Sequence, residues 1–220
     1  MPIRSRGAAL AQLSVVSLYV ADGGVQEQSP YVETVRARWM AGGGELWVMA
    51  EPVGPTDLAG ARAALSYFME ALPSRRASVT SSISAAIAAC HQRLRSGGEE
   101  EPRLAVALSC VLLRGQKVYL AQAGPALAYV LEAGEARRLK PTLGHVHAVG
   151  VAAARPGVSF HHQEMEEGDR VLVAFGVLDE MLPVEGVASL LRPVPSEAMR
   201  KVYLLAHDRA PFSALLVYLS

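Results

Sequence analysis

The sequence predicts an α+β protein, a four-layer α-β-β-α sandwich in which helices flank two antiparallel sheets. Three observations lead to this fold class. Segments 104–113, 170–175 and 214–219 are almost continuously apolar, which indicates burial on both faces. Short turns join many of the strands, and such connections require antiparallel pairing. Amphipathic helical patterns lie between and after the strands, so each sheet can have the other sheet on one face and helices on the other.

The N-terminal part predicts three short strands, at residues 13–20, 34–39 and 45–50. The glycines at 42–44 make the last two strands a hairpin; they lack the spacing and the lysine of a phosphate-binding loop. The first strand follows two arginines, as a signal sequence would. Polar residues interrupt its apolar run, however, and we expect a cytoplasmic protein.

Helical periodicity begins near residue 57. Apolar residues recur three and four positions apart over 58–72 and again over 79–94, which predicts two amphipathic helices. Thr56 or Asp57 is placed to cap the first helix.

The C-terminal half predicts three strand pairs, two helices and a closing strand. The pairs are 104–113 with 117–122, 126–131 with 136–139, and 158–164 with 170–175. The helices cover 185–191 and 196–207, and the last strand covers 213–219. Because no repeat or linker interrupts this order, we expect one domain over residues 1–220.

Composition limits the chemistry. The 220 residues carry 21 basic and 21 acidic side chains, and a net charge of zero argues against nucleic-acid binding. Only five of the acids are aspartates, so chemistry that needs clustered aspartates has few residues to use. Cys90 and Cys110 are too few for a disulfide framework or a zinc site, and we expect both to be buried.

Four segments carry a family pattern. Residues 165–180 hold Gly-Asp-Arg before an apolar strand, and 117–131 form a hairpin around Gly124. Residues 46–55 are a strand and turn before a helix, and 210–219 are the closing strand. In this order, from about Leu13 to Leu219, they resemble the metal-dependent type 2C serine/threonine protein phosphatases, the PPM family. The resemblance implies the same four-layer fold.

The resemblance also implies a chemistry whose ligands this chain lacks. In that family, aspartates hold two Mg²⁺ or Mn²⁺ ions that activate a water, and such a pair of hard cations needs several carboxylates. Those aspartates align here with Glu51, Gly176 and Ala210. Pro52 replaces the glycine that follows the first of them, and proline cannot adopt a positive φ.

Two further motifs of the family have lost charged residues in this sequence. Gly-Asp-Ser-Arg becomes Gly124-Pro125-Ala126-Leu127. Aligned from Gly24, the N-terminal motif places Gln26 at a phosphate-binding arginine and places Pro30 and Tyr31 at an acidic pair.

We therefore expect a degenerate, inactive member, a pseudophosphatase, with no catalytic residues, metal ligands or cofactor of its own. Its partner would be another protein, such as a phosphoprotein or a component of a kinase pathway, and neither nucleic acid nor a membrane.

Two alternatives remain open. One is an active Mn²⁺- or Mg²⁺-dependent phosphatase with a rearranged acid set of Asp22, Glu51 and Asp208. The other is a metal- or ligand-binding module built from histidines, which are His145, His147, His161 and His162. Because neighbouring strand residues face opposite ways, only one of the last two could join such a site.

The remaining acids in the motifs have structural interpretations. We expect Asp169 to accept hydrogen bonds from backbone N–H groups of its own turn. Asp179 and Glu180 follow the lost aspartate position, and we expect them to begin a short helix or turn.

Two arginine pairs could bind phosphate. Arg75 and Arg76, between the two long helices, could hold a phosphorylated partner by bidentate hydrogen bonds. We interpret this pair, and the pair Arg137 and Arg138, as solvated loop residues.

Overall fold

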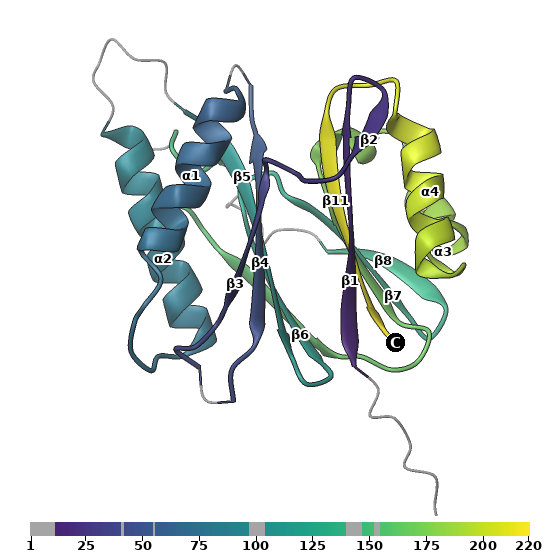
Figure 1. Cartoon of the computed structure of the whole chain (residues 1–220), viewed down its shortest axis with the longest axis horizontal. Helices are drawn as coiled ribbons and strands as arrows, with labels where there is room; N and C mark the ends of the chain where they lie inside the picture. The colour runs from purple at the N-terminus through teal and green to yellow at the C-terminus, as the bar shows by residue number, and fades with distance from the viewer. Residues whose placement is uncertain (1–11, 41, 55, 97–103, 140–146, 152–154) are drawn as a thin grey trace, which may run out of the picture.

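The computed structural model describes residues 12–40, 42–54, 56–96, 104–139, 147–151 and 155–220. Two sheets face each other, and a pair of helices covers the outer face of each sheet (Figure 1). All strand pairs are antiparallel. The predicted four-layer α-β-β-α sandwich is confirmed.

The six-stranded sheet has the order β2-β1-β11-β10-β7-β8. Its strands are β1 (Leu13–Ala21), β2 (Gly24–Gln26), β7 (Leu127–Glu132), β8 (Glu135–Leu139), β10 (Arg170–Ala174) and β11 (Phe212–Leu219). Helices α3 (Val184–Leu191) and α4 (Pro195–Ala206) cover this sheet (Figure 1). Strands β10 and β11 are buried over most of their length, as their apolar runs predict, because layers cover both of their faces.

The five-stranded sheet has the order β3-β4-β5-β6-β9. Its strands are β3 (Val32–Arg36), β4 (Glu45–Pro52), β5 (Val106–Arg114), β6 (Lys117–Ala123) and β9 (Ser159–Glu164). Helices α1 (Leu58–Glu70) and α2 (Val79–Arg95) cover it. Asp57 caps α1 by accepting a hydrogen bond from the Gly60 N–H at 3.0 Å, which confirms one of the two predicted caps.

Two strand predictions were wrong, and one strand was missed. Segments 158–164 and 170–175 do not form a hairpin, because β9 pairs with β6 in one sheet and β10 lies between β7 and β11 in the other. The turn between β9 and β10 crosses from sheet to sheet. The strand predicted at 34–39 is observed at Val32–Arg36, since Trp39 is buried in the turn that follows. The three-residue strand β2 has no recognisable pattern.

The glycine turn at 42–44 and the burial of both cysteines are confirmed. Gly42, Gly43 and Gly44 form the β3–β4 turn with positive φ, and a Cβ at Gly44 would lie 2.8 Å from the Leu113 carbonyl oxygen. Cys90 and Cys110 are buried free thiols. Among the described helices, none is long and apolar enough to cross a membrane.

Candidate functional site

The positions that align with the family's metal ligands include residues that meet between the sheets, at one end of the sandwich. Glu51 lies near the end of β4, and Phe175 and Gly176 follow β10. Ser213 lies at the start of β11, and Tyr31 lies in the segment that links β2 to β3. We call these five residues the inter-sheet site.

The Glu51 carboxyl group is held by backbone. Its Oε1 accepts a hydrogen bond from the Gly176 N–H at 2.7 Å. A Cβ at Gly176 would lie 3.2 Å from that same oxygen, so the absence of a side chain at 176 makes room for the glutamate. Burial raises the pKa of Glu51 to about 7, against the opposing effect of the bond from Gly176. Near neutral pH this carboxyl is therefore only partly charged.

Two aromatic rings of the inter-sheet site pack against each other. The Tyr31 and Phe175 rings pack edge to face with centroids 5.2 Å apart, and Tyr19 packs against Tyr31 in the same way at 5.7 Å. Tyr31 is 8% exposed and Phe175 is 4% exposed. An apolar ring thus stands at position 31, where the resemblance implies an acid.

Hydrogen bonds fix the segment that crosses between the sheets. The Ser29 and Ser213 hydroxyl groups lie 2.6 Å apart, and Ser29 Oγ also accepts from the Tyr31 N–H at 3.1 Å. The Tyr31 carbonyl accepts from the Ala50 N–H at 2.9 Å, and the Phe175 N–H donates to the Ser213 carbonyl at 3.1 Å. The inter-sheet site is therefore tied to both sheets.

A two-metal centre does not fit these residues. Two divalent cations need several carboxylates, and the inter-sheet site contributes Glu51 alone. Ala210, which aligns with another ligand, lies in the bend before β11 and has no side-chain oxygen. Within the described ranges, no three His, Cys, Asp or Glu residues lie close enough together to hold a metal ion.

The rearranged acid set is not assembled either. Asp22 occupies the tight β1–β2 turn with a φ of 53°. Asp208 is exposed in the turn after α4, where it lies 3.9 Å from Arg209. Neither of these acids forms a metal-binding group with Glu51 in the part of the chain that the structure describes.

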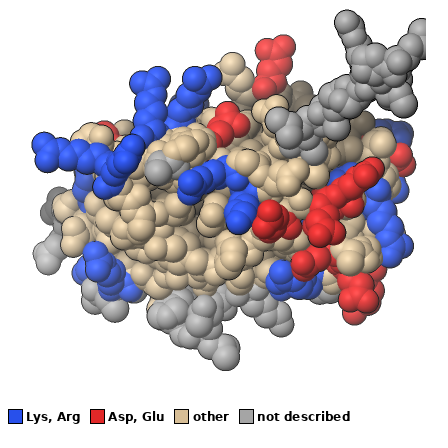
Figure 2. All heavy atoms as spheres, turned by 90° about the horizontal axis from the view of Figure 1, so that it is seen from below, with Lys and Arg blue, Asp and Glu red and all other residues tan. Residues whose placement is uncertain are grey.

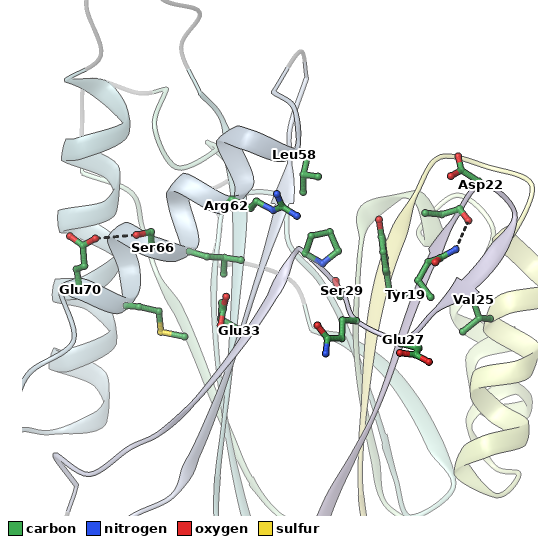
Figure 3. A pocket seen from close by; sticks show the side chains of 16 residues that line it. Tyr19, Asp22, Val25, Glu27, Ser29, Glu33, Leu58, Arg62, Ser66 and Glu70 are labelled. Carbon is green, nitrogen blue, oxygen red and sulfur yellow. Dashed lines mark hydrogen bonds between the residues drawn. The ribbon is translucent and has the colours of Figure 1, made fainter.

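A groove of about 1380 Å³ lies next to the inter-sheet site, between α1 and the β1–β2 hairpin (Figure 3). Tyr19 and Ser29 line it and also contact the inter-sheet site; Gln26 and Pro30, the other aligned positions, line it too. Its charged lining residues are Asp22, Glu27, Glu33, Arg62 and Glu70. Glu70 forms an ion pair with Arg93, so three carboxylates and one guanidinium leave the groove acidic, and it disfavours a free phosphate.

The histidines lie apart from this site. His162 on β9 stacks on Tyr119 with centroids 6.3 Å apart. Its neighbour His161 is half-buried, and burial and the nearby Arg137 lower its pKa. His147 is exposed, and His145 lies outside the described residues. The described histidines take part in no metal-binding cluster.

Asp169 has the structural role that its turn predicts. It is 5% exposed and accepts hydrogen bonds from the Glu166 N–H at 3.0 Å, the Ala133 N–H at 3.3 Å and the Gln163 amide at 3.3 Å. These bonds hold the crossing from β9 to β10.

The pair Arg137 and Arg138 is not in a solvated loop, so that prediction was wrong. Both lie on β8, where acids flank them: Arg137 lies 3.7 Å from Glu132, and Arg138 forms an ion pair with Asp179 at 2.8 Å. Asp179 directly follows a single 3₁₀ turn, Gly176–Leu178, which agrees with the short turn predicted here. It also accepts a hydrogen bond from the Tyr129 hydroxyl at 3.2 Å.

Comparisons place this geometry among known folds. No protein-family profile and no curated protein matches the sequence, whereas solved structures match the fold. PppA from Pseudomonas aeruginosa, described as a key regulatory component of T6SS, has a TM-score of 0.72 at 17% identity, covering 96% of this chain and 99% of its own. The PPM Ser-Thr phosphatase MsPP from Mycobacterium smegmatis, in complex with cacodylate, has a TM-score of 0.68 at 16% identity, covering 96% and 100%.

The catalytic domain of the serine/threonine phosphatase PstP, solved in complex with two manganese ions, has a TM-score of 0.68 at 16% identity, covering 95% of this chain and 99% of that domain. At such low identity the likeness concerns the fold. The chain has the fold of the PPM-type serine/threonine phosphatases.

Proposed function

We propose that this protein is a catalytically inactive, PPM-type phosphatase-like domain, a pseudophosphatase that acts in the cytoplasm by binding and regulating another protein. The observation that carries the proposal is the content of the inter-sheet site. The site offers one carboxyl, that of Glu51, and two buried aromatic rings, whereas a two-metal hydrolase needs several carboxylates.

The state of Glu51 supports this proposal. Its carboxyl is engaged by the Gly176 N–H, and burial raises its pKa to about 7, so it offers less than one full negative charge at neutral pH. Two divalent cations bring four positive charges. Tyr31 and Phe175, the buried aromatic residues of the same site, add no carboxylate.

The groove supports recognition rather than hydrolysis. Its carboxylates repel a phosphate monoester unless bound metal ions offset their charge. The described residues form no cluster that could hold such an ion. The similarity in fold to PppA, described as a key regulatory component of T6SS, supports a regulatory role on this fold.

An activity assay tests the proposal. The purified protein is incubated with an aryl phosphate and Mn²⁺ or Mg²⁺, with a chelator in parallel, and compared with Glu51→Ala and with Glu185→Ala, an exposed acid on α3. We expect no turnover above the buffer blank in any sample. A metal-dependent rate that Glu51→Ala abolishes and Glu185→Ala retains would contradict the proposal, and loss of that rate in Asp22→Ala or Asp208→Ala would favour the rearranged acid set. Stoichiometric zinc or iron in the preparation would favour the histidine module.

A further inference from the structure

Exposed arginines gather at the end of the sandwich away from the inter-sheet site. Glu51 lies near the last residue of β4 and Glu45 is its first, which puts about 20 Å of strand between the two ends. The β3–β4 turn, the α1–α2 loop and the β5–β6 turn meet at the Glu45 end. We call their exposed arginines the arginine end: Arg36, Arg38, Arg75, Arg76 and Arg114.

Contacts between the loops bring these arginines together. The Ala77 N–H of the α1–α2 loop donates to the Trp39 carbonyl of the β3–β4 turn at 3.3 Å. A Cβ on Gly42 would lie 3.4 Å from an Arg114 guanidinium nitrogen, so that guanidinium rests on the same turn. Arg36 is on β3 and Arg114 on β5, the two strands that flank β4, which separates their backbones by about 10 Å.

The charges of the arginine end have no internal partner. Within the described ranges, none of its five side chains makes an ion pair or a hydrogen bond, although Glu45 stands opposite Arg36 in the β3–β4 register. The neighbouring Lys117, by contrast, lies 3.5 Å from Glu164. Figure 2 shows this end, with basic side chains gathered over its left half and most acidic ones to the right of centre.

The loops that carry the arginines are anchored. Trp39 and Met40 are 5% and 6% exposed, and they hold the β3–β4 turn against the core. Ser78, at the end of the α1–α2 loop, caps α2. An anchored scaffold lowers the entropy that binding costs, so a ligand need only order the arginine side chains.

We propose that the arginine end binds a phosphorylated segment of a partner protein. Guanidinium groups pair with phosphate through two parallel hydrogen bonds, and arginine clusters recognise phosphorylated motifs in this way. In an extended chain, side chains two positions apart lie on one face about 7 Å apart, and long arginine side chains on backbones about 10 Å apart can reach both of them. Two phosphates there carry a charge of nearly −4, whereas two carboxylates carry −2, and the phosphates therefore balance five arginines better.

The surroundings disfavour other polyanions. The exposed large apolar residues of the described chain lie elsewhere, at Val25, Val151, Val194, Leu204 and Leu205, so this end has no group to insert into a membrane. A nucleic-acid duplex is held by many phosphate contacts along its length, whereas the five arginines are confined to one end of the sandwich. This inference rests on the proposed binding role and gives it a surface distinct from the inter-sheet site.

Fluorescence anisotropy with labelled peptides tests it. Three peptides share one sequence with two positions separated by a single residue, and those positions hold phosphoserine, glutamate or serine. We expect the phosphorylated peptide to bind at least about tenfold more tightly than the glutamate peptide, the serine peptide not to bind, and binding to weaken as salt rises. A chelator is present and phosphate release is measured, so turnover, which would contradict the pseudophosphatase, is seen separately from failure to bind.

Charge-matched variants locate the surface. Arg38→Glu/Arg75→Glu/Arg76→Glu should weaken binding at least about tenfold, while Arg155→Glu/Arg200→Glu/Arg209→Glu, exposed residues outside the arginine end, should change it less than about twofold. Replacing the first three residues by lysine keeps the charge and should still weaken binding several-fold, because lysine lacks the bidentate geometry.

Several results would overturn the inference. One is equal weakening by the two glutamate variants; another is equal affinity for the phosphoserine and glutamate peptides. A third is displacement of the phosphopeptide by duplex DNA or phosphatidylserine vesicles at lower concentrations than by the unlabelled phosphopeptide. Thermal unfolding of each variant checks the fold, which exposed substitutions should leave intact.

Discussion

Glu51 and Gly176 change the chemistry of the inter-sheet site as a pair. The resemblance implies aspartate at both positions; here the side chain is longer at 51 and absent at 176. The glutamate reaches the Gly176 N–H at 2.7 Å through space that a side chain at 176 would crowd. The pair thus forms an internal contact between the sheets in place of two ligands.

The raised pKa of Glu51 predicts a specific pH dependence of stability. Because the folded-state pKa is about 7 and the ordinary value is 4.5, the folded protein holds this proton more tightly than the unfolded chain. The contribution of Glu51 to stability is therefore full below about pH 4.5 and is lost as the pH rises through 7, by about 3 kcal/mol in total.

Glu51→Gln removes this titration. Urea unfolding at several pH values measures the unfolding free energy of both proteins. The difference, variant minus wild type, should increase by up to about 3 kcal/mol from pH 4 to pH 8. Glu185→Gln, at an exposed carboxyl, is the control. Parallel stability curves for the wild type and Glu51→Gln would show that Glu51 does not titrate as a buried group.

The aromatic filling of the inter-sheet site predicts a large packing cost. Phe175→Ala would leave a cavity between the sheets and remove the edge-to-face partner of Tyr31, lowering the free energy of unfolding by about 3–5 kcal/mol. Val25→Ala, at a side chain that is 61% exposed, should change it by less than about 0.5 kcal/mol. A loss at Phe175 as small as that at Val25 would mean that the ring does not fill the site. Urea denaturation measures both.

At the scale of elements, the crossing from β9 to β10 places the two strands in different sheets. Asp169 holds this turn with three hydrogen bonds, two of them from backbone N–H groups. Asp169→Ala would leave those donors without their acceptor and should cost about 1–3 kcal/mol of unfolding free energy. Asp169→Asn should cost less, since an amide oxygen can still accept, and the exposed Asp208→Ala should be neutral. Equal stability of Asp169→Ala and Asp208→Ala would contradict this role.

The elements that the sequence predicts best are those buried on both faces. Val106–Arg114, Arg170–Ala174 and Phe212–Leu219 are long apolar runs, and burial between layers explains them. The β9–β10 crossing could not be predicted, because a glycine turn shows that the chain reverses but not which sheet receives it. Strand β2 is three residues long and mostly exposed, so no hydrophobic pattern marks it.

The resemblance implies acids at the positions of Glu51, Gly176 and Ala210, and this alignment, with the loss of metal ligands that it implies, stays a prediction. What fills the site depends on contacts between distant segments, such as the Glu51–Gly176 bond between residues 125 positions apart, which no local pattern encodes. The contact of Tyr31 with Phe175 likewise follows from the packing of the two sheets against each other.

For the whole molecule, zero net charge conceals a separation of charge. The groove carries three carboxylates beside the Glu70–Arg93 ion pair and one arginine of its own, while five unpaired arginines form the arginine end. We therefore predict that the protein is retained on a cation exchanger at pH 7 despite its neutrality. Arg38→Glu/Arg75→Glu/Arg76→Glu should elute at lower salt than Arg155→Glu/Arg200→Glu/Arg209→Glu, although the two variants have equal net charge. Identical elution would contradict a localised arginine end.

We infer that the phosphatase fold of this chain persists without metal chemistry. Calorimetric titration of Mn²⁺ into the metal-free protein tests this inference, because it requires neither a substrate nor a partner. We expect no saturable binding at the inter-sheet site and no rise in melting temperature with excess Mn²⁺. Saturable binding of two Mn²⁺ ions per chain, lost in Glu51→Ala, would contradict it.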